Sequence, residues 1–141
     1  VRNPWSRTLS GYQNLVRHIE ENRNDLMKDH ISEVLKLHGK PPTFNEWVSL
    51  LPLITANVGP DWTMSTPQTE WILPKVDYVI KLENLEKDFQ KIQELFKNEK
   101  PLGVLNKSKL TLDYRAVYSD DSKKIVAKLF ESDIDMWHYT F

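Results

Sequence analysis

The sequence contains no cysteine, and its four glycines are widely scattered. The absence of cysteine excludes disulfides, thiolate catalysis and cysteine-based metal sites. The scattered glycines exclude, within these residues, a glycine-rich loop of the kind that cradles phosphates. No stretch approaches the roughly 18 consecutive apolar residues that a membrane-spanning helix requires, and no signal peptide is visible. Together these absences favour a cytoplasmic protein without a membrane span.

A large excess of charge of one sign is also absent. The chain has 19 lysines and arginines against 20 aspartates and glutamates, for a formal net charge of −1. General nucleic-acid binders carry a basic excess, because phosphate neutralisation drives their affinity. We therefore expect no nucleic-acid partner, and any anion site has to be local. The histidines do not stand at metal-ligand spacing, so the sequence predicts no metal site.

The chain does have enough apolar sequence for a core. It has 141 residues, of which 40% are hydrophobic and 28% are charged, and five are tryptophans. This composition is typical of one folded domain of ordinary size. Apolar residues recur at helical spacing along much of the chain. Helices are predicted over residues 4–23 and 24–38, after Thr43, after Asn84 and after one of residues 119–121.

Capping signals indicate where these helices begin and end. Asn3 or Ser6 can cap the first helix, and the residues alone do not decide between them. Glu46 stands three residues after Thr43, which is the spacing of a capping box. Gly39 and the two prolines that follow it end the second helix. A further proline is expected to end or kink the third helix.

One internal segment has the pattern of a strand. Residues 76–82 alternate and are rich in β-branched and aromatic side chains. Val1 and Arg2 look like the end of another strand that leads directly into the first helix. A lone strand leaves backbone groups unpaired, so an upstream segment or another chain should pair with it. The sequence therefore predicts a helix-rich α/β fold with few strands and with unpaired edges through which two copies of the chain can associate.

The opening residues, VRNPWSRTLSGY, have the chemistry of an anion site. A strand-to-helix turn directs free backbone amides and the positive end of the helix dipole at one point. Arg2 can reach that point with a guanidinium suited to phosphate, and Ser10 adds a hydroxyl donor. Arg7 and Ser10 share a helix face. The alternative is that both arginines are solvated surface charges and Ser10 is a small packing residue.

The same stretch resembles the 3′-phosphate-binding motif of sulfotransferases, Arg-x-Pro-x-x-Arg-x-x-Ser-x-Tyr. The motif is matched at Arg2, Pro4, Arg7, Ser10 and Tyr12. In that family the sulfuryl donor is 3′-phosphoadenylyl sulfate. The resemblance implies that Arg2 and Ser10 bind the 3′-phosphate of this donor, with Arg7 as the second arginine of the motif.

Further blocks of the chain resemble the carbohydrate-type sulfotransferases. The pattern Pro-Gln…Asp-(Phe/Tyr)-Val…Glu-x-Leu-x-x-Asp-Phe is matched at Pro67, Gln68, Asp77, Tyr78, Val79, Glu83, Leu85, Asp88 and Phe89. An Asn-x-Ser element follows at Asn106 and Ser108, and the last residues are similar to the family's Asp-x-x-x-(Phe/Trp)-x-Tyr ending. The resemblance covers both ends and the middle of the chain, whereas residues 20–56 carry no matching motif.

The resemblance implies the C-terminal part of a P-loop-like α/β domain, so that residues 1–141 are one partial sulfotransferase domain. The family's loop for the 5′-phosphosulfate lies N-terminal to the arginine-serine motif and is not among these residues. The catalytic base is expected upstream of Val1. The isolated chain is therefore expected to be inactive, because Arg2 and Ser10 would bind the 3′-phosphate of the donor and not the phosphosulfate that reacts. The histidine that many relatives carry just before Pro67 is also missing.

The implied reaction is transfer of a sulfuryl group from 3′-phosphoadenylyl sulfate to a hydroxyl acceptor, with a carbohydrate as the expected acceptor and no metal. The candidate acceptor-binding residues are Trp62, Gln68 and Trp71. Aromatic faces suit sugar rings, and both tryptophans lie in a proline-rich loop, where core burial is an equal alternative. Trp47 is expected in the core. Two other functions remain open: a non-catalytic helical interaction module, and a self-associating remnant of the fold.

Overall fold

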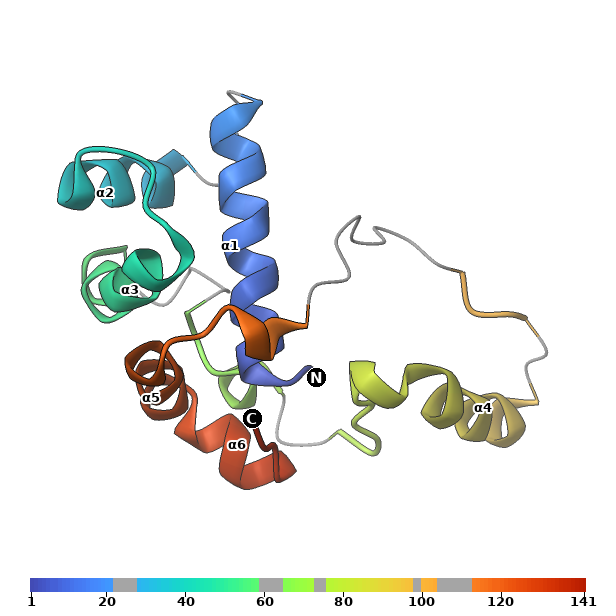
Figure 1. Ribbon diagram of the computed structural model, residues 1–141. Coiled ribbons are helices and arrows are strands. Elements are labelled where there is room, and N and C mark those ends of the chain that lie inside the picture. The colour runs from blue at the N-terminus through green and yellow to red at the C-terminus, as the bar shows by residue number, and fades with distance from the viewer. Residues whose placement is uncertain (22–27, 59–64, 73–75, 98–99, 104–112) are drawn as a thin grey trace.

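The computed structural model describes residues 1–21, 28–58, 65–72, 76–97, 100–103 and 113–141 (Figure 1). Within these ranges the chain forms helices and irregular segments, and no strand. The α-helices are α1 (Pro4–Glu20), α2 (Lys28–His38), α3 (Phe44–Val58), α4 (Leu85–Phe96), α5 (Asp120–Leu129) and α6 (Glu131–Trp137). The short 3-10 helices are η1 (Gln68–Glu70), η2 (Leu82–Asn84) and η3 (Tyr114–Ala116). The predicted helix-rich character is confirmed here, and the P-loop-like α/β fold stays a prediction.

Side-chain caps fix where α1 and α3 begin. The Asn3 side chain accepts hydrogen bonds from the amides of Trp5 (3.1 Å) and Ser6 (3.2 Å), so Asn3 is the N-cap of α1 and Ser6 is not. At α3 the Glu46 carboxylate accepts from the hydroxyl (2.6 Å) and the amide (2.7 Å) of Thr43, which confirms the predicted capping box. The hydroxyl bond and then the amide bond hold the pKa of Glu46 below its usual value.

The helices differ from the sequence prediction at three places. α1 ends at Glu20 and not at residue 23. Of the two expected effects of Pro52, an end or a kink, the first is wrong, because α3 continues to Val58. The turn after the proline is held by burial, since Ile54 is fully buried in the core. The single helix predicted at the end of the chain is two helices, α5 and α6, because Phe130 leaves the helical region (φ −116°, ψ 30°). The Phe130 ring is fully buried, so this break lies in the core.

The prediction of a strand over residues 76–82 is wrong. Residues 76–81 are irregular, and η2 begins at Leu82. The Val1 nitrogen donates to the Ile80 carbonyl (2.6 Å), and the Leu82 amide donates to the Val1 carbonyl (2.7 Å). These two bonds have the pattern of a parallel β pair, but a single pair does not make a strand. The segment with strand-like sequence therefore lies beside Val1 without forming a sheet in the described ranges.

The core lies between α1, α2, α3 and α5. Figure 1 shows α1 running beside α2 and α3, with α5 and α6 near its N-terminal end. Trp47 on α3 is 1% exposed and packs on Tyr12 of α1, with ring centroids 5.7 Å apart, so its predicted core role is confirmed. The other buried apolar side chains are Trp5, Leu9, Leu15, Ile31, Val34, Phe44, Val48, Leu51, Ile54, Val126, Phe130, Trp137 and Tyr139. None of the described helices is long and apolar enough to cross a membrane.

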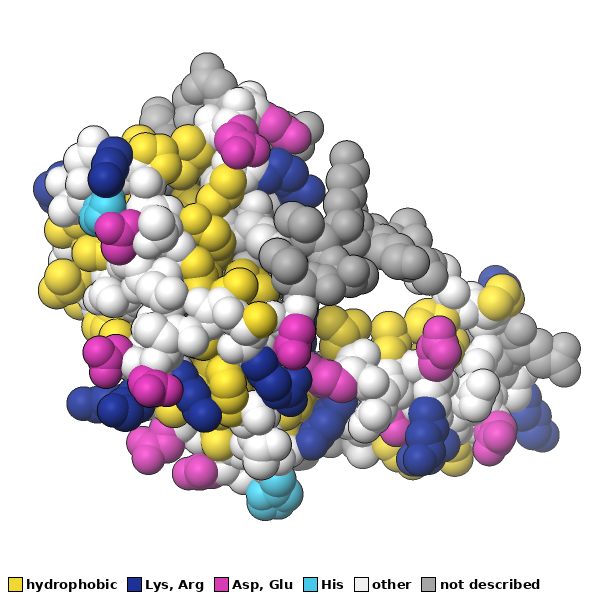
Figure 2. Space-filling view, in the orientation of Figure 1, with side chains coloured by type: hydrophobic (Ala, Val, Ile, Leu, Met, Phe, Trp, Pro, Cys, Tyr) yellow, Lys and Arg dark blue, Asp and Glu magenta, His cyan; other side chains and the backbone are white. Residues whose placement is uncertain are grey.

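α4 stands apart from this core (Figure 1). The helix forms over the predicted residues, but none of its side chains is buried. Leu95 and Phe96 near its end are 58% and 71% exposed. Figure 2 shows hydrophobic side chains along the upper edge of the region that contains α4. The apolar stripe of α4 is therefore present in the sequence, but within the described ranges it is not buried against the core.

Candidate anion-binding site at the start of α1

Arg2 lies one residue before the N-cap of α1, and its side chain bends back over the first turn. Its Nε and Nη2 atoms donate to the Ser6 hydroxyl at 3.1 and 2.9 Å. Ser10 is one helical turn further along the same face and is half-buried. Arg2, Ser6 and Ser10 thus form a row at four-residue intervals. Ser6 was predicted only as a possible cap, although the four-residue spacing in the sequence indicates its place in the row.

The guanidinium of Arg2 is partly desolvated and remains a cation. Burial lowers its pKa from the ordinary value, and the Glu83 carboxylate opposes that shift. Arginine nevertheless stays protonated at any ordinary pH. Within the described ranges Arg2 forms no ion pair, and its side chain donates to the neutral hydroxyl of Ser6. A cation whose partner is neutral can form charge-assisted hydrogen bonds with an incoming anion.

The backbone amides at this turn are already bonded. The amides of Trp5 and Ser6 donate to the Asn3 side chain, and the Asn3 amide donates to Glu83 (2.6 Å). The amide of Arg2 is likewise bonded, to a side chain of η1 (2.9 Å). The prediction that free amides at this turn are directed at an anion is therefore wrong, because the cap and distant side chains occupy them. An anion at this position has to be held by side chains.

Arg7 lies in a different environment from Arg2. Its Nη2 atom donates to the Thr66 carbonyl (3.0 Å), and its Nη1 atom is 3.7 Å from an Asp133 carboxylate oxygen. Its guanidinium also lies over the Phe130 ring, 5.4 Å from the centroid. Burial lowers the pKa of Arg7, and Asp133 opposes that shift. Arg7 thus connects α1 to the segment before η1 and to α6. A role for Arg7 in donor binding stays a prediction.

Gln68 and Asp133 form a hydrogen-bond network under the start of α1. The Arg2 amide donates to Gln68 Oε1 (2.9 Å), and Gln68 Nε2 donates to the Arg2 carbonyl (2.8 Å). Asp133 is fully buried and accepts from the Gln68 amide (2.8 Å), from Gln68 Nε2 (3.2 Å) and from the Thr69 amide (2.8 Å). The network therefore connects α6 and η1 to the backbone of Arg2. Asp133 is the aspartate of the C-terminal Asp-x-x-x-(Phe/Trp)-x-Tyr pattern, and that pattern alone does not indicate this network.

The three candidate acceptor-binding residues are not seen together. Trp62 lies outside the described residues, as do Asn106 and Ser108. Trp71 follows η1 and is 49% exposed, so its ring is available to solvent. Gln68 is turned toward the backbone of Arg2. Acceptor binding by these residues stays a prediction.

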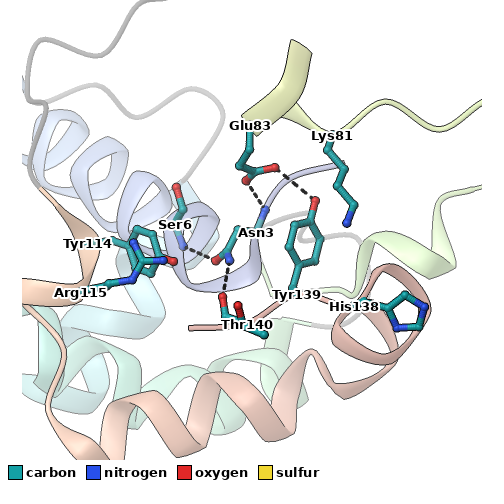
Figure 3. Close-up of a pocket in the computed structure, with 9 residues that line it drawn as sticks. All are labelled: Asn3, Ser6, Lys81, Glu83, Tyr114, Arg115, His138, Tyr139 and Thr140. Carbon is teal, nitrogen blue, oxygen red and sulfur yellow. Dashed lines mark hydrogen bonds between the residues drawn. The ribbon is translucent and has the colours of Figure 1, made fainter. Parts of the chain in front are cut away.

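A polar pocket of about 320 Å³ lies next to this row of residues (Figure 3). The Glu83 carboxylate in its wall accepts from the Asn3 amide (2.6 Å) and from the Tyr139 hydroxyl (3.4 Å). Burial and then the nearby Glu83 carboxylate raise the pKa of Tyr139. Ser6 belongs both to this wall and to the row with Arg2. The lining residues are Asn3, Ser6, Lys81, Glu83, Tyr114, Arg115, His138, Tyr139 and Thr140.

Metal-ligating residues do not gather in the part of the chain that the structure describes. No group of three or more histidine, aspartate or glutamate side chains there is arranged to hold an ion. The side chains available to an anion near the start of α1 are instead the Arg2 guanidinium and the hydroxyls of Ser6 and Ser10. Such a set can bind and orient an anion.

Comparisons with known proteins give one match. A family model described as "Sulfotransferase family" matches residues 1–140. Searches of the curated proteins and of the solved structures found no match.

Proposed function

The chain belongs to the sulfotransferase family, and from that premise we propose that its donor is 3′-phosphoadenylyl sulfate, held at the 3′-phosphate by Arg2 and Ser10. Family membership supports sulfuryl transfer in general. The identity of the donor, and the binding of its 3′-phosphate by Arg2 and Ser10, are what we propose beyond family membership. We further propose that Arg7 helps to place α1 through its contacts with Thr66 and Asp133.

The observation that carries this proposal is the state of the Arg2 side chain. Its guanidinium is partly buried and forms no ion pair within the described ranges. It donates hydrogen bonds to the Ser6 hydroxyl at the start of α1. Ser10 lies one turn away on the same face. A phosphate group accepts charge-assisted hydrogen bonds from a guanidinium and ordinary ones from hydroxyls. The N-terminal end of the helix dipole adds a favourable field for the anion, even though the amides are occupied.

The proposed roles of Arg2 and Ser10 are binding and orientation. In sulfuryl transfer the sulfur–oxygen bond of the phosphosulfate breaks, and sulfur becomes bonded to the acceptor oxygen. The acceptor hydroxyl loses its proton, and adenosine 3′,5′-bisphosphate leaves. Residues that hold the 3′-phosphate act at the far end of the donor and place its reactive end. We propose a carbohydrate hydroxyl as the acceptor, which is supported by the resemblance of residues 67–89 and by the exposed ring of Trp71.

Calorimetry with two nucleotides tests the proposed phosphate site. Adenosine 3′,5′-bisphosphate and adenosine 5′-phosphate differ only in the 3′-phosphate, so the ratio of their affinities measures what that group contributes. We expect the chain to prefer the bisphosphate by about tenfold or more, since charge-assisted bonds contribute about 1.5–3 kcal/mol each. Arg2→Ala should remove most of this preference, and Ser10→Ala should remove a smaller part of it.

Arg17→Ala provides a matched control. Arg17 is an exposed arginine in the last turn of the same helix, so its removal changes net charge without touching the proposed site. The control should keep the preference for the bisphosphate. Equal affinity of the unmodified chain for both nucleotides would contradict the proposed function, as would an equal loss in Arg2→Ala and Arg17→Ala.

A further inference from the structure

We infer that Gln68 and Asp133 are positioning residues for the Arg2 guanidinium. This inference rests on the proposed function, because it concerns how the same phosphate site is held. Gln68 contacts Arg2 through the backbone, with its Oε1 atom 2.9 Å from the Arg2 nitrogen and its Nε2 atom 2.8 Å from the Arg2 oxygen. Asp133, from α6, fixes Gln68 in turn.

The backbone of Arg2 needs such a partner. Arg2 precedes the N-cap Asn3, so its N–H and C=O groups lie outside the helical hydrogen-bond pattern. Buried backbone groups require partners, and Gln68 supplies one acceptor and one donor from a single side chain. Two bonds to the same residue fix the orientation of its peptide groups. The direction in which the Arg2 side chain leaves the backbone is then fixed as well.

The Asp133 carboxylate sets the orientation of the Gln68 amide. An ionised carboxylate only accepts hydrogen bonds, so the NH₂ group of Gln68 has to face it. Gln68 Nε2 lies 3.2 Å from Asp133 Oδ2 and 2.8 Å from the Arg2 carbonyl, which leaves Oε1 for the Arg2 amide. The main-chain amides of Gln68 and Thr69 anchor the same carboxylate at 2.8 Å each. A flipped amide would place a donor against the Arg2 N–H.

The same contacts argue against Gln68 as a direct ligand. Both protons of its amide nitrogen are engaged, one by the Arg2 carbonyl and one by Asp133. Its oxygen accepts from the Arg2 amide. No amide proton remains for an acceptor or a phosphate. Gln68 thus acts on the anion through the position of Arg2.

A double-mutant cycle tests this role. The readout is the affinity ratio between adenosine 3′,5′-bisphosphate and adenosine 5′-phosphate, which isolates the 3′-phosphate. We expect Gln68→Ala to reduce the ratio several-fold, because an Arg2 guanidinium that is no longer held in place makes weaker charge-assisted bonds to the 3′-phosphate. If Gln68 acts through Arg2, adding Gln68→Ala to Arg2→Ala should not change the ratio further. Gln90→Ala, at an exposed glutamine of α4, is the matched control and should leave the ratio unchanged.

A second variant, Gln68→Met, tests whether the effect of Gln68→Ala comes from lost hydrogen bonds or from lost packing. Gln68→Met keeps the length of the side chain and removes both polar atoms, and the same loss is expected, with circular dichroism confirming that each variant is folded. A normal ratio in folded Gln68→Ala or Gln68→Met overturns the inference, and so does an additional loss in the Arg2→Ala background. Those results leave the proposed function standing. A ratio of one in the unmodified chain contradicts the proposed function itself, so the two failures are distinguishable.

Discussion

Replacement of Asp133 by alanine is expected to lower the free energy of unfolding by about 3–5 kcal/mol, the range for breaking a buried charge pair. Asp133 is fully buried and accepts hydrogen bonds from two main-chain amides, those of Gln68 and Thr69. It also lies 3.7 Å from the Arg7 guanidinium. The substitution leaves these partly buried donors without their acceptor. Urea unfolding followed by tryptophan fluorescence measures the change.

Asp135→Ala is the matched control for this prediction. Asp135 is in the same helix, two residues further on, and its side chain is exposed. Its replacement should change stability by less than about 0.5 kcal/mol, as is usual for surface positions. Equal effects of the two substitutions would show that the Asp133 network does not hold α6, η1 and α1 together. Folded Asp133→Ala should also lose part of its preference for adenosine 3′,5′-bisphosphate, because Gln68 and Arg7 lose their shared partner.

Replacement of Trp47 by alanine is expected to have a stability effect of the same size, about 3–5 kcal/mol, for a different reason. Trp47 is 1% exposed and packs between Tyr12 of α1 and Phe44 of its own helix, with ring centroids 5.7 and 6.4 Å away. Alanine leaves a large cavity that the surrounding rings cannot fill. The midpoint of urea unfolding should fall with little change in its slope.

Trp71→Ala is the control, since Trp71 is 49% exposed and its loss creates no cavity. It should leave stability nearly unchanged. Where Trp47→Ala is still folded, it should keep the nucleotide preference, because the ring partners of Trp47, Tyr12 and Phe44, are not among the residues that bond to Arg2. Loss of that preference in folded Trp47→Ala would show that the site depends on the core as a whole. A stability change below about 1 kcal/mol would contradict the core role of Trp47.

Local features of the fold could be predicted from the sequence. The capping box of Thr43 and Glu46, the end of α2 at Gly39 and the core role of Trp47 each depend on a few neighbouring residues or on one apolar pattern. Gly39 adopts φ +76°, a conformation that glycine takes with little strain. Such local signals carry their physical cause within one or two helical turns. The family, too, was evident from short motifs in the right order.

Contacts between distant segments could not be predicted in the same way. Gln68 and Asp133 are 65 residues apart in the sequence, and nothing in either neighbourhood indicates that they bond to each other. The occupied amides at the start of α1 depend on Glu83 and Gln68, which are again remote. The strand prediction failed for a related reason. A strand needs neighbours along its whole length, and residues 76–82 have two ladder-type bonds, both to Val1, in the described ranges.

The row of Arg2, Ser6 and Ser10 could be predicted from the sequence only in part. Its four-residue spacing is visible in the sequence, but the separate roles of the two motif arginines are not. Arg7 is turned to Thr66 and Asp133, whereas Arg2 rests on a hydroxyl and forms no ion pair within the described ranges. Both side chains are partly buried, and burial lowers the pKa of each. Their partners distinguish them: Arg7 contacts a carbonyl and a carboxylate, whereas the guanidinium of Arg2 donates to the Ser6 hydroxyl.

A crystal structure of the chain with adenosine 3′,5′-bisphosphate would locate the 3′-phosphate. We expect its oxygens within hydrogen-bonding distance of the Arg2 guanidinium and the Ser10 hydroxyl, with the Gln68 amide still bonded to the Arg2 backbone. A 3′-phosphate bound elsewhere, for example between Lys81 and Arg115 in the neighbouring pocket, would contradict this expectation.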